Sequence, residues 1–342
     1  MNPGKPEKYT ALAEKLRRYF SAGNFKRGDK LPSERDLSRE FECSHLTVRR
    51  ALAVLEREEK IHSIPSKGIF AGVRPRDERQ VAIVGFLVPD REIYYFDLFA
   101  ELEKRLRDMN LCTIFGISDS SPAKEHAFLR SLKELRATAL IAMPNPKCRE
   151  EYASLHLSTV FFDNGIPGLK IPVVLSDDFG GALSAVEYLI RTGCRRIAHI
   201  GGITDPAFEN RLRGYREALL RHGIAENPEF VMRNTPGREW GILASRKLFS
   251  LPNPPDAVFC ANDAIAAGVQ HYFRDKGKPP CPIIGFGGTS VSWDLGLNTV
   301  DQHPEKITEA LVRNLRMMLN GEEPPEETVI PSTMILRNNG KS

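Results

Sequence analysis

Between residues 81 and 319, short apolar segments alternate with longer segments of helical periodicity, and this alternation restricts the fold more than any other feature. The apolar segments are residues 81–88, 112–117, 139–143, 159–162, 196–201, 257–260 and 283–286. The helical patterns are residues 96–109, 124–135, 181–192, 210–222, 240–249, 264–276 and 304–319. Nearly continuous apolar strands separated by helices indicate parallel sheets that helices cover on both faces. The predicted fold class is therefore α/β.

This α/β part, residues 81–342, is longer than a single hydrophobic core usually holds. We therefore expect two lobes, each with its own sheet. Lobe one is predicted at about 81–175 and 299–322, and lobe two at about 176–298 and 323–338. A small molecule would bind between the lobes, at the C-terminal ends of the strands.

The first 73 residues follow another pattern and are predicted to form a winged helix-turn-helix domain. Three helical segments precede two short alternating segments at 61–64 and 69–71, which suggest a two-stranded ribbon. Ser33 and Ser44 are typical first residues of the second and third helices. A charged stretch with Pro75 follows, and we place the linker at residues 74–80.

The charge of the chain is concentrated at this end. Residues 1–76 hold 17 lysines and arginines against 10 acidic residues, a net charge of +7, whereas the remainder has a net charge of −3. A basic head suggests an anionic partner, although charge alone does not distinguish nucleic acid from a membrane surface.

A helix-turn-helix places the N-terminal residues of its second helix in the major groove of DNA. His45 and Thr47 occupy that position, and Arg49 and Arg50 follow, where they could reach base edges or phosphates. The tip of the ribbon, Lys67-Gly68, would contact the backbone or the minor groove. The alternative, that both arginines are only solvated helix positions, is disfavoured because the cap, turn, helix and ribbon all agree.

The head resembles the GntR family of winged helix-turn-helix regulators. Three separate blocks, residues 31–37, 47–52 and 67–70, carry the resemblance in the same order as in the family. The resemblance implies DNA contacts from Arg35, Ser44, Thr47, Arg49 and Gly68, with Ser33 and Glu34 at the start of the second helix. This chain has His45 where the family often has arginine, so the base preference at that position stays open.

The body resembles the LacI-type effector domain, which has the periplasmic-binding-protein-like type I fold. The blocks that carry this resemblance are residues 84–88, 176–182, 195–202, 211–219 and 261–263. No LacI-type hinge helix is visible, and the GntR-type head takes the place of the LacI-type one. The combination is similar to the arabinose-repressor architecture.

This second resemblance implies a ligand cleft. The residues that it assigns to the cleft are Tyr95, Phe96, Asp163, Arg211, Trp240 and Asn262. A guanidinium such as that of Arg211 binds sugar hydroxyls or an anionic group, and aromatic rings pack on a sugar ring. Trp240 and Phe96 could also be ordinary core residues, and Asp263 is expected to cap the helix that follows it.

Gly287 departs from the family pattern, because an acidic residue that binds hydroxyls usually stands there. Losing a charge-assisted hydrogen bond costs about 1.5–3 kcal/mol. Three explanations fit: a ligand other than a simple sugar, an acceptor supplied by another residue such as Asp294, or a pocket that has degenerated.

The sequence contains no catalytic motif that favours an enzyme, and we predict neither a cofactor nor a metal site. The six scattered cysteines suggest a reducing compartment, and no apolar segment of membrane-spanning length is present. The start of the sequence gives no sign of a secretory signal. A cytoplasmic location is therefore expected.

The predicted function is a ligand-responsive transcription regulator of bacterial type. We expect a repressor that binds a palindromic operator as a homodimer and responds to a sugar or a similar small polar molecule. One alternative is a cytoplasmic solute-binding or sensor protein whose head contacts another protein. A second alternative is an enzyme built on the same α/β body.

Overall fold

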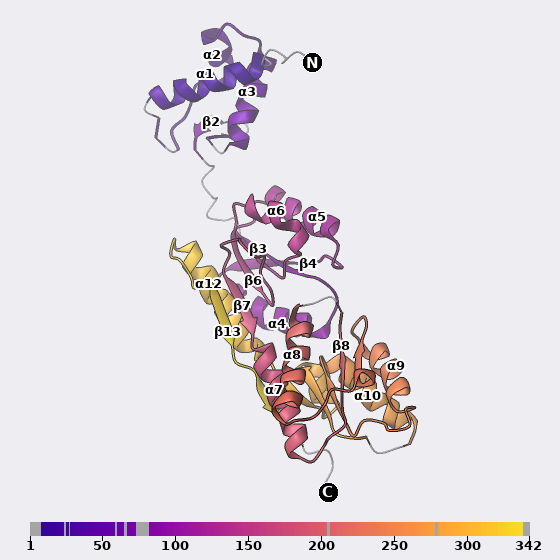
Figure 1. Ribbon diagram of the computed structural model, residues 1–342. Coiled ribbons are helices and arrows are strands. Elements are labelled where there is room, and N and C mark those ends of the chain that lie inside the picture. The colour runs from indigo at the N-terminus through magenta and orange to yellow at the C-terminus, as the bar shows by residue number, and fades with distance from the viewer. Residues whose placement is uncertain are drawn as a thin grey trace, which may run out of the picture. The chain divides into compact units, whose positions relative to one another are not determined.

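The computed structural model describes residues 8–23, 25–26, 28–58, 60–64, 67–72, 82–203, 206–277 and 280–337. The chain forms two compact units, Met1–Gln80 and Val81–Ser342, here called the head and the body (Figure 1). The linker predicted at residues 74–80 lies outside the described residues.

The head is a winged helix-turn-helix, as the sequence predicts. Its elements are α1 (Lys8–Ala22), α2 (Glu34–Glu40), α3 (His45–Arg57), β1 (Ile61–Ile64) and β2 (Gly68–Ala71). The two strands pair in an antiparallel ribbon. Apolar residues from all three helices and the ribbon form one core, in which Leu16, Leu37, Val48 and Leu55 are fully buried.

Two serines fix the starts of the second and third helices. The Ser33 hydroxyl accepts a hydrogen bond from the backbone N–H of Asp36 (3.3 Å), and the Asp36 carboxylate accepts one from the Ser33 backbone N–H (3.3 Å), which is a capping box. The Ser44 hydroxyl accepts a hydrogen bond from the Thr47 backbone N–H (3.2 Å). These caps satisfy backbone donors that would otherwise lack partners, and Ser44 ends the four-residue turn between α2 and α3.

Lobe one of the body is a six-stranded sheet with helices on both faces (Figure 1). The strand order is β13 (Glu327–Ile330), β7 (Val173–Ser176), β6 (Ser158–Phe162), β5 (Ala139–Ala142), β3 (Ala82–Val88) and β4 (Leu111–Ile117), and every pairing is parallel. The helices α4 (Ile93–Arg107) and α12 (Pro304–Leu319) cover one face, and α5 (Pro122–Glu134) and α6 (Arg149–Ala153) the other.

Lobe two repeats this three-layer arrangement. Its strand order is β14 (Thr333–Ile335), β12 (Asn298–Asp301), β11 (Ile283–Gly287), β10 (Ala257–Cys260), β8 (Ile197–Gly201) and β9 (Val231–Arg233), and only β14 is antiparallel to its neighbour. The helices α7 (Asp178–Arg191) and α8 (Pro206–Arg221) cover one face, and α9 (Arg238–Leu248) and α10 (Asp263–Asp275) the other. A short helix, α11 (Ser290–Asp294), precedes β12.

The structure divides the lobes differently from our prediction at two places. The strand β12 pairs with β11 and belongs to lobe two, although residues 299–322 were assigned to lobe one. The strand β13 pairs with β7 and belongs to lobe one, although residues 323–338 were assigned to lobe two. The prediction was wrong because both strands are only four residues long. The side chains of so short a strand do not show which sheet it will join, since its pairing partner lies far away in the sequence.

The chain therefore passes between the lobes three times in the described structure. The passages follow β7, β12 and β13 and run from Ser176 to Asp178, from Asp301 to Pro304 and from Ile330 to Thr333. At the first two, the Gln302 amide donates a hydrogen bond to the Ser176 hydroxyl (2.9 Å). The site between the lobes lies beside these connections.

The core of lobe two contains a neutral histidine. His199 on β8 is 1% exposed and lies between the rings of Tyr215 and Phe259. Burial, together with the positive charges of Arg233, Arg216 and Arg211, lowers the pKa of His199 to about 3.

This histidine is expected to make the body sensitive to acid. Between its unfolded pKa of about 6.5 and its folded pKa, only the unfolded chain binds the proton, so the free energy of unfolding falls as the pH falls, by up to about 1.4 kcal/mol per pH unit. Urea unfolding between pH 7 and pH 5 measures this slope, and His199→Phe should flatten it. An unchanged slope in the variant would contradict the prediction.

Two further observations concern the described residues alone. None of their helices is both long and apolar enough to cross a membrane. None of their His, Cys, Asp and Glu side chains gather in groups of three or more that could hold a metal ion.

Candidate functional site

The exposed start of α3 is the candidate DNA-reading surface of the head. His45, Leu46 and Arg49 are exposed there, and Thr47 is half-buried. Leu46 is 60% exposed, which is unusual for a leucine and was not selected from the sequence. An apolar side chain at this position could contact the methyl group of thymine.

Arg49 is held loosely in the isolated head. Its guanidinium lies 3.3 Å from the Glu34 carboxylate, and its side chain is 73% exposed. An exposed ion pair of this kind contributes little to stability, so Arg49 is available to exchange Glu34 for a base or a phosphate. Glu34, which we expected at the start of the second helix, lies in the first turn of α2 and also forms this ion pair with Arg49.

Arg50 lies on another side of α3. Consecutive residues of a helix point about 100° apart, and Arg50 lines a shallow pocket with Tyr9 of α1 and with Val54 and Arg57 of α3. The structure thus separates the two neighbouring arginines, and Arg49 is the one that joins the exposed residues at the start of the helix.

The other predicted head residues divide into caps and exposed positions. The hydroxyls of Ser33 and Ser44 cap α2 and α3, and the Ser44 and Thr47 hydroxyls lie 2.8 Å apart. Arg35 and Lys67 are exposed, and Gly68 begins β2 at the tip of the ribbon.

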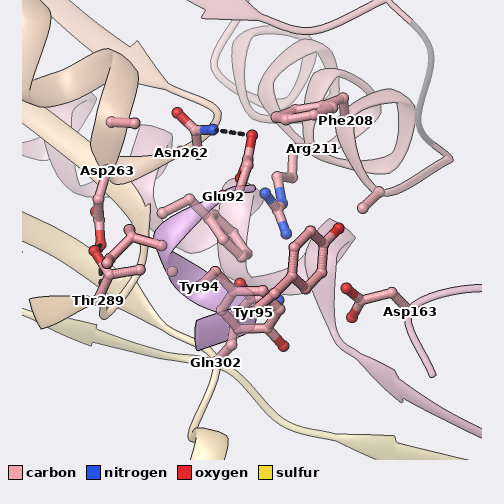
Figure 2. Close-up of a pocket in the computed structure, with 15 residues that line it drawn as sticks. Glu92, Tyr94, Tyr95, Asp163, Phe208, Arg211, Asn262, Asp263, Thr289 and Gln302 are labelled. Atoms are coloured by element: carbon pink, nitrogen blue, oxygen red, sulfur yellow. Dashed lines mark hydrogen bonds between the residues drawn. The ribbon is translucent and has the colours of Figure 1, made fainter. Parts of the chain in front are cut away.

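A pocket lies between the two lobes of the body (Figure 2). Lobe one contributes residues from the start of α4 and the end of β6, and lobe two contributes residues from α8, α10 and β11. The described residues that line it are Glu92, Ile93, Tyr94, Tyr95, Asp163, Ala207, Phe208, Arg211, Asn262, Asp263, Ala264, Phe286, Gly287, Thr289 and Gln302. Four of the six predicted ligand residues, Tyr95, Asp163, Arg211 and Asn262, are among them.

Arg211 is the charged centre of this pocket. Its guanidinium donates to the Asp178 carboxylate (2.8 Å) and to the Ala261 carbonyl (2.7 Å), and both charged side chains are 8% exposed. Its central carbon lies 4.0 Å from the centre of the Phe286 ring. Arg211 is therefore fixed in position, and its charge is already balanced by Asp178.

Two hydrogen-bonded contacts connect the lobes at and beside the pocket. The Asn262 side-chain amide donates to the Glu92 carboxylate (2.8 Å), as Figure 2 shows. The backbone N–H of Ser290, on α11, donates to the Asp97 carboxylate of α4 (2.9 Å). Glu92 directly precedes α4, and Asp97 lies near its start. The N-terminal part of α4 therefore supplies both lobe-one acceptors.

Aromatic residues and one strained acid form the lobe-one wall. Tyr95 is 4% exposed and donates a hydrogen bond to the Met143 sulfur (3.2 Å). Burial raises the pKa of the Tyr94 hydroxyl well above its usual value, and a hydrogen bond with the Ser176 side chain opposes that rise. Asp163, at the end of β6, has a φ of 58°, a left-handed conformation that residues other than glycine adopt at a cost.

Phe96 and Trp240, which we also assigned to the cleft, are not among the residues that line this pocket. Phe96 is 40% exposed and packs on Phe115. Trp240 is 8% exposed, belongs to the core of lobe two, and donates its indole N–H to the Gly201 carbonyl (3.2 Å). A family position fixes a residue along the helix, but local packing decides which way its side chain points.

The expectation for Asp263 also needs correction. Asn262, not Asp263, caps α10, because its side-chain oxygen accepts from the Ile265 backbone N–H (2.9 Å). Asp263 is fully buried and accepts hydrogen bonds from Thr299 (2.6 Å) and from the backbone and hydroxyl of Thr289 (2.8 and 2.9 Å). Burial raises the pKa of Asp263, and these hydrogen bonds oppose that rise.

Gly287 has a geometry that disfavours the usual acid. Its φ is 132°, and a Cβ atom there would lie 3.3 Å from the Asp263 carboxylate and 3.1 Å from Thr289. A second carboxylate would therefore be strained and would face a buried one. Asp294, our alternative acceptor, is exposed on α11 and does not line the pocket.

Sequence reasoning missed Glu92, Asp178 and Gln302. Glu92 precedes α4, which begins three residues before the predicted start. Asp177 caps α7 by accepting from the backbone N–H of Gly180 (2.8 Å), whereas the neighbouring Asp178 pairs with Arg211. The pairing of acid and arginine was not detectable, because 33 residues separate them.

Comparisons with known proteins agree with both parts of this description. Residues 8–71 match the model of the bacterial regulatory proteins of the gntR family, and residues 186–338 match that of the periplasmic binding protein-like domain. The arabinose metabolism transcriptional repressor of Geobacillus stearothermophilus is 25% identical over 332 residues, which cover 91% of this chain and 90% of that protein.

Solved structures share the fold of the body. The transcription regulator CcpA of Lactococcus lactis aligns with a TM-score of 0.69 at 20% identity, covering 77% of this chain and all of that one. A periplasmic binding protein/LacI transcriptional regulator from Alkaliphilus metalliredigens, complexed with D-xylulofuranose, aligns with a TM-score of 0.66 at 22% identity, covering 76% of this chain and 99% of that one.

The fold and these matches define a transcription regulator in which a DNA-binding head is joined to a periplasmic-binding-protein-like body. The resemblances that the sequence suggested are thereby confirmed. Within this class, the head belongs to the gntR family of bacterial regulatory proteins.

Proposed function

We propose that this chain represses transcription as a homodimer on a palindromic operator and that a sugar-like molecule in the inter-lobe pocket releases it. The observation that carries the proposal is a pocket lined from both lobes, with Arg211 fixed on one side and Glu92 and Tyr95 on the other. A ligand that touches both lobes changes the balance between their arrangements, and it can do so only by its difference in affinity for them.

The head supplies the DNA-binding half of this proposal. His45, Leu46, Thr47 and Arg49 at the start of α3 would read bases, and Arg35, Lys67 and Gly68 would contact the backbone or the minor groove. Glu34, Ser33 and Ser44 would hold these groups in place, and Arg50 would at most contact a phosphate. An isologous dimer would present two heads to two half-sites of the operator.

The body supplies the sensing half. A relative with the same fold was solved with D-xylulofuranose, which supports a sugar-like effector for this chain. The sequence contains none of the catalytic motifs that would favour an enzyme, which supports binding as the role of the pocket. We therefore propose a sensor without enzymatic activity that acts in the cytoplasm.

DNA binding and ligand response can be tested together. A binding site is first selected in vitro from random duplexes with the full chain, and its affinity is then measured over a range of salt concentrations. We expect binding at least about 1,000-fold tighter than to random DNA, with a log–log salt slope of about −0.9 for each phosphate neutralised. A sugar that raises the melting temperature of the chain should weaken this binding by about 5- to 150-fold.

The alternatives give different results in the same experiment. A solute sensor whose head contacts a protein would respond to a sugar but show no sequence preference for DNA. An enzyme on the same body would convert the sugar during the measurement, which chromatography of the recovered sugar would detect. Either result would contradict the proposed function.

A further inference from the structure

The described lining of the inter-lobe pocket holds more acidic than basic side chains. Glu92, Asp163 and Asp263 line it, whereas Arg211 is its single basic residue among the described ones. Asp178 already pairs with Arg211 at 2.8 Å. The positive charge that the family pattern offers to a ligand is thus balanced within the protein.

This charge distribution disfavours an anionic ligand. A carboxylate or phosphate brought to Arg211 would also approach the carboxylates of Glu92 and Asp163, and burial between the lobes strengthens that repulsion. An uncharged hydroxyl has no such cost and can donate a hydrogen bond to a carboxylate.

Glu92 is the carboxylate best placed to accept ligand hydroxyls. An acid at position 287, on lobe two, would be strained, and Asp263 behind it is occupied by Thr289 and Thr299. Glu92 reaches the pocket from lobe one, and its carboxylate points into it beside Arg211 (Figure 2). A carboxylate accepts up to about four hydrogen bonds, so the bond from Asn262 does not exhaust it.

We propose that the pocket selects an uncharged polyhydroxy ligand and that Glu92 is the residue that sets this selectivity. Because Glu92 also accepts the hydrogen bond from Asn262, the group that binds the ligand is one that joins the two lobes. Recognition of a hydroxyl and closure of the lobes would then depend on the same carboxylate. This inference rests on the proposed function, since it concerns the effector site of the regulator.

The experiment compares neutral sugars with anions of the same skeleton. Thermal shift and calorimetric titration of the full chain use D-galactose with D-galacturonate, D-glucose with D-glucose 6-phosphate, and D-ribose with D-ribose 5-phosphate. We expect at least one neutral member to bind, and to bind at least 10-fold more tightly than its anion. Glu92→Gln should weaken the neutral sugar about 10-fold and reduce the difference within the pair.

Asp294→Asn is the matched control, because it removes the same charge from an exposed position outside the pocket. Its affinities should equal those of the unaltered chain. An anion that binds as tightly as its neutral partner, or a Glu92→Gln chain that binds the sugar unchanged, would overturn the inference. Failure of all six compounds to bind would overturn it as well.

DNA binding by the same preparations separates the inference from the proposed function. If the selected DNA site is bound and an anion proves to be the better ligand, only the charge selectivity is wrong. If neither the DNA site nor any sugar is bound by correctly folded protein, the proposed function itself fails.

Discussion

Replacing Arg49 by alanine is expected to weaken binding of the full chain to its selected DNA site by about 5- to 150-fold, the range for loss of a bidentate contact to a base. Arg49 lies on the exposed start of α3, and its ion-pair partner among the described residues is the half-buried Glu34. Arg49 therefore contributes to the free energy of DNA binding and little to the stability of the head. Fluorescence anisotropy with a labelled duplex measures the change.

The way in which the affinity falls identifies the type of contact. Loss of a base contact relaxes the preference at one base pair, whereas loss of a phosphate contact weakens all sequences equally and lowers the salt slope by about 1. Arg191→Ala on α7 is the control, since it removes one exposed positive charge from the body. Equal affinities of the two variants would show that Arg49 is only a solvated position of the helix.

Replacing Asp178 by asparagine is expected to destabilise lobe two by about 3–5 kcal/mol, because the buried guanidinium of Arg211 would lose its counter-ion. Both side chains are 8% exposed, so water does not compensate for the loss. Urea unfolding followed by tryptophan fluorescence reports on this lobe, since both tryptophans of the chain, Trp240 and Trp293, belong to it.

Glu187→Gln provides the control on the same helix. Glu187 pairs with two arginines, Arg191 (3.7 Å) and Arg221 (3.8 Å), but both arginines are exposed, and each pair should contribute at most about 0.5 kcal/mol. The double variant with Asp178→Asn and Arg211→Met should recover part of the lost stability, because no unpaired charge remains buried. If Asp178→Asn unfolds at the same urea concentration as Glu187→Gln, the buried pair is not a major source of stability.

The sequence was sufficient to predict the positions of the strands in the centre of each sheet. β10, for example, consists of four buried apolar residues and coincides with the predicted segment 257–260. β13 alternates exposed and half-buried residues, and β14 has only three residues, so neither has a run of apolar residues to mark it. Their pairing partners are set by long-range contacts, which a local pattern does not contain.

Residues of the candidate pocket could be predicted from the sequence where the order of strands and helices alone determines their location. Arg211 and Asn262 lie in the pocket because each belongs to, or directly precedes, a helix that starts at the end of a strand. Trp240 sits on such a helix as well, but the Gly201 carbonyl and the apolar core hold its ring inside lobe two. Glu92 was not predicted because what marks it is its hydrogen bond with Asn262, which is 170 residues away in the sequence.

The order in which the lobes are completed follows from the placement of β13 and β14. The first five strands of lobe one leave the ribosome before any strand of lobe two, but the sixth, β13, is made after every strand of lobe two except β14. A nascent chain that ends before residue 327 leaves the edge of β7 without its partner, and an unpaired strand edge invites aggregation. Both lobes must therefore wait for the same short segment, residues 327–335, so lobe one matures only after the domain inserted within it is almost complete.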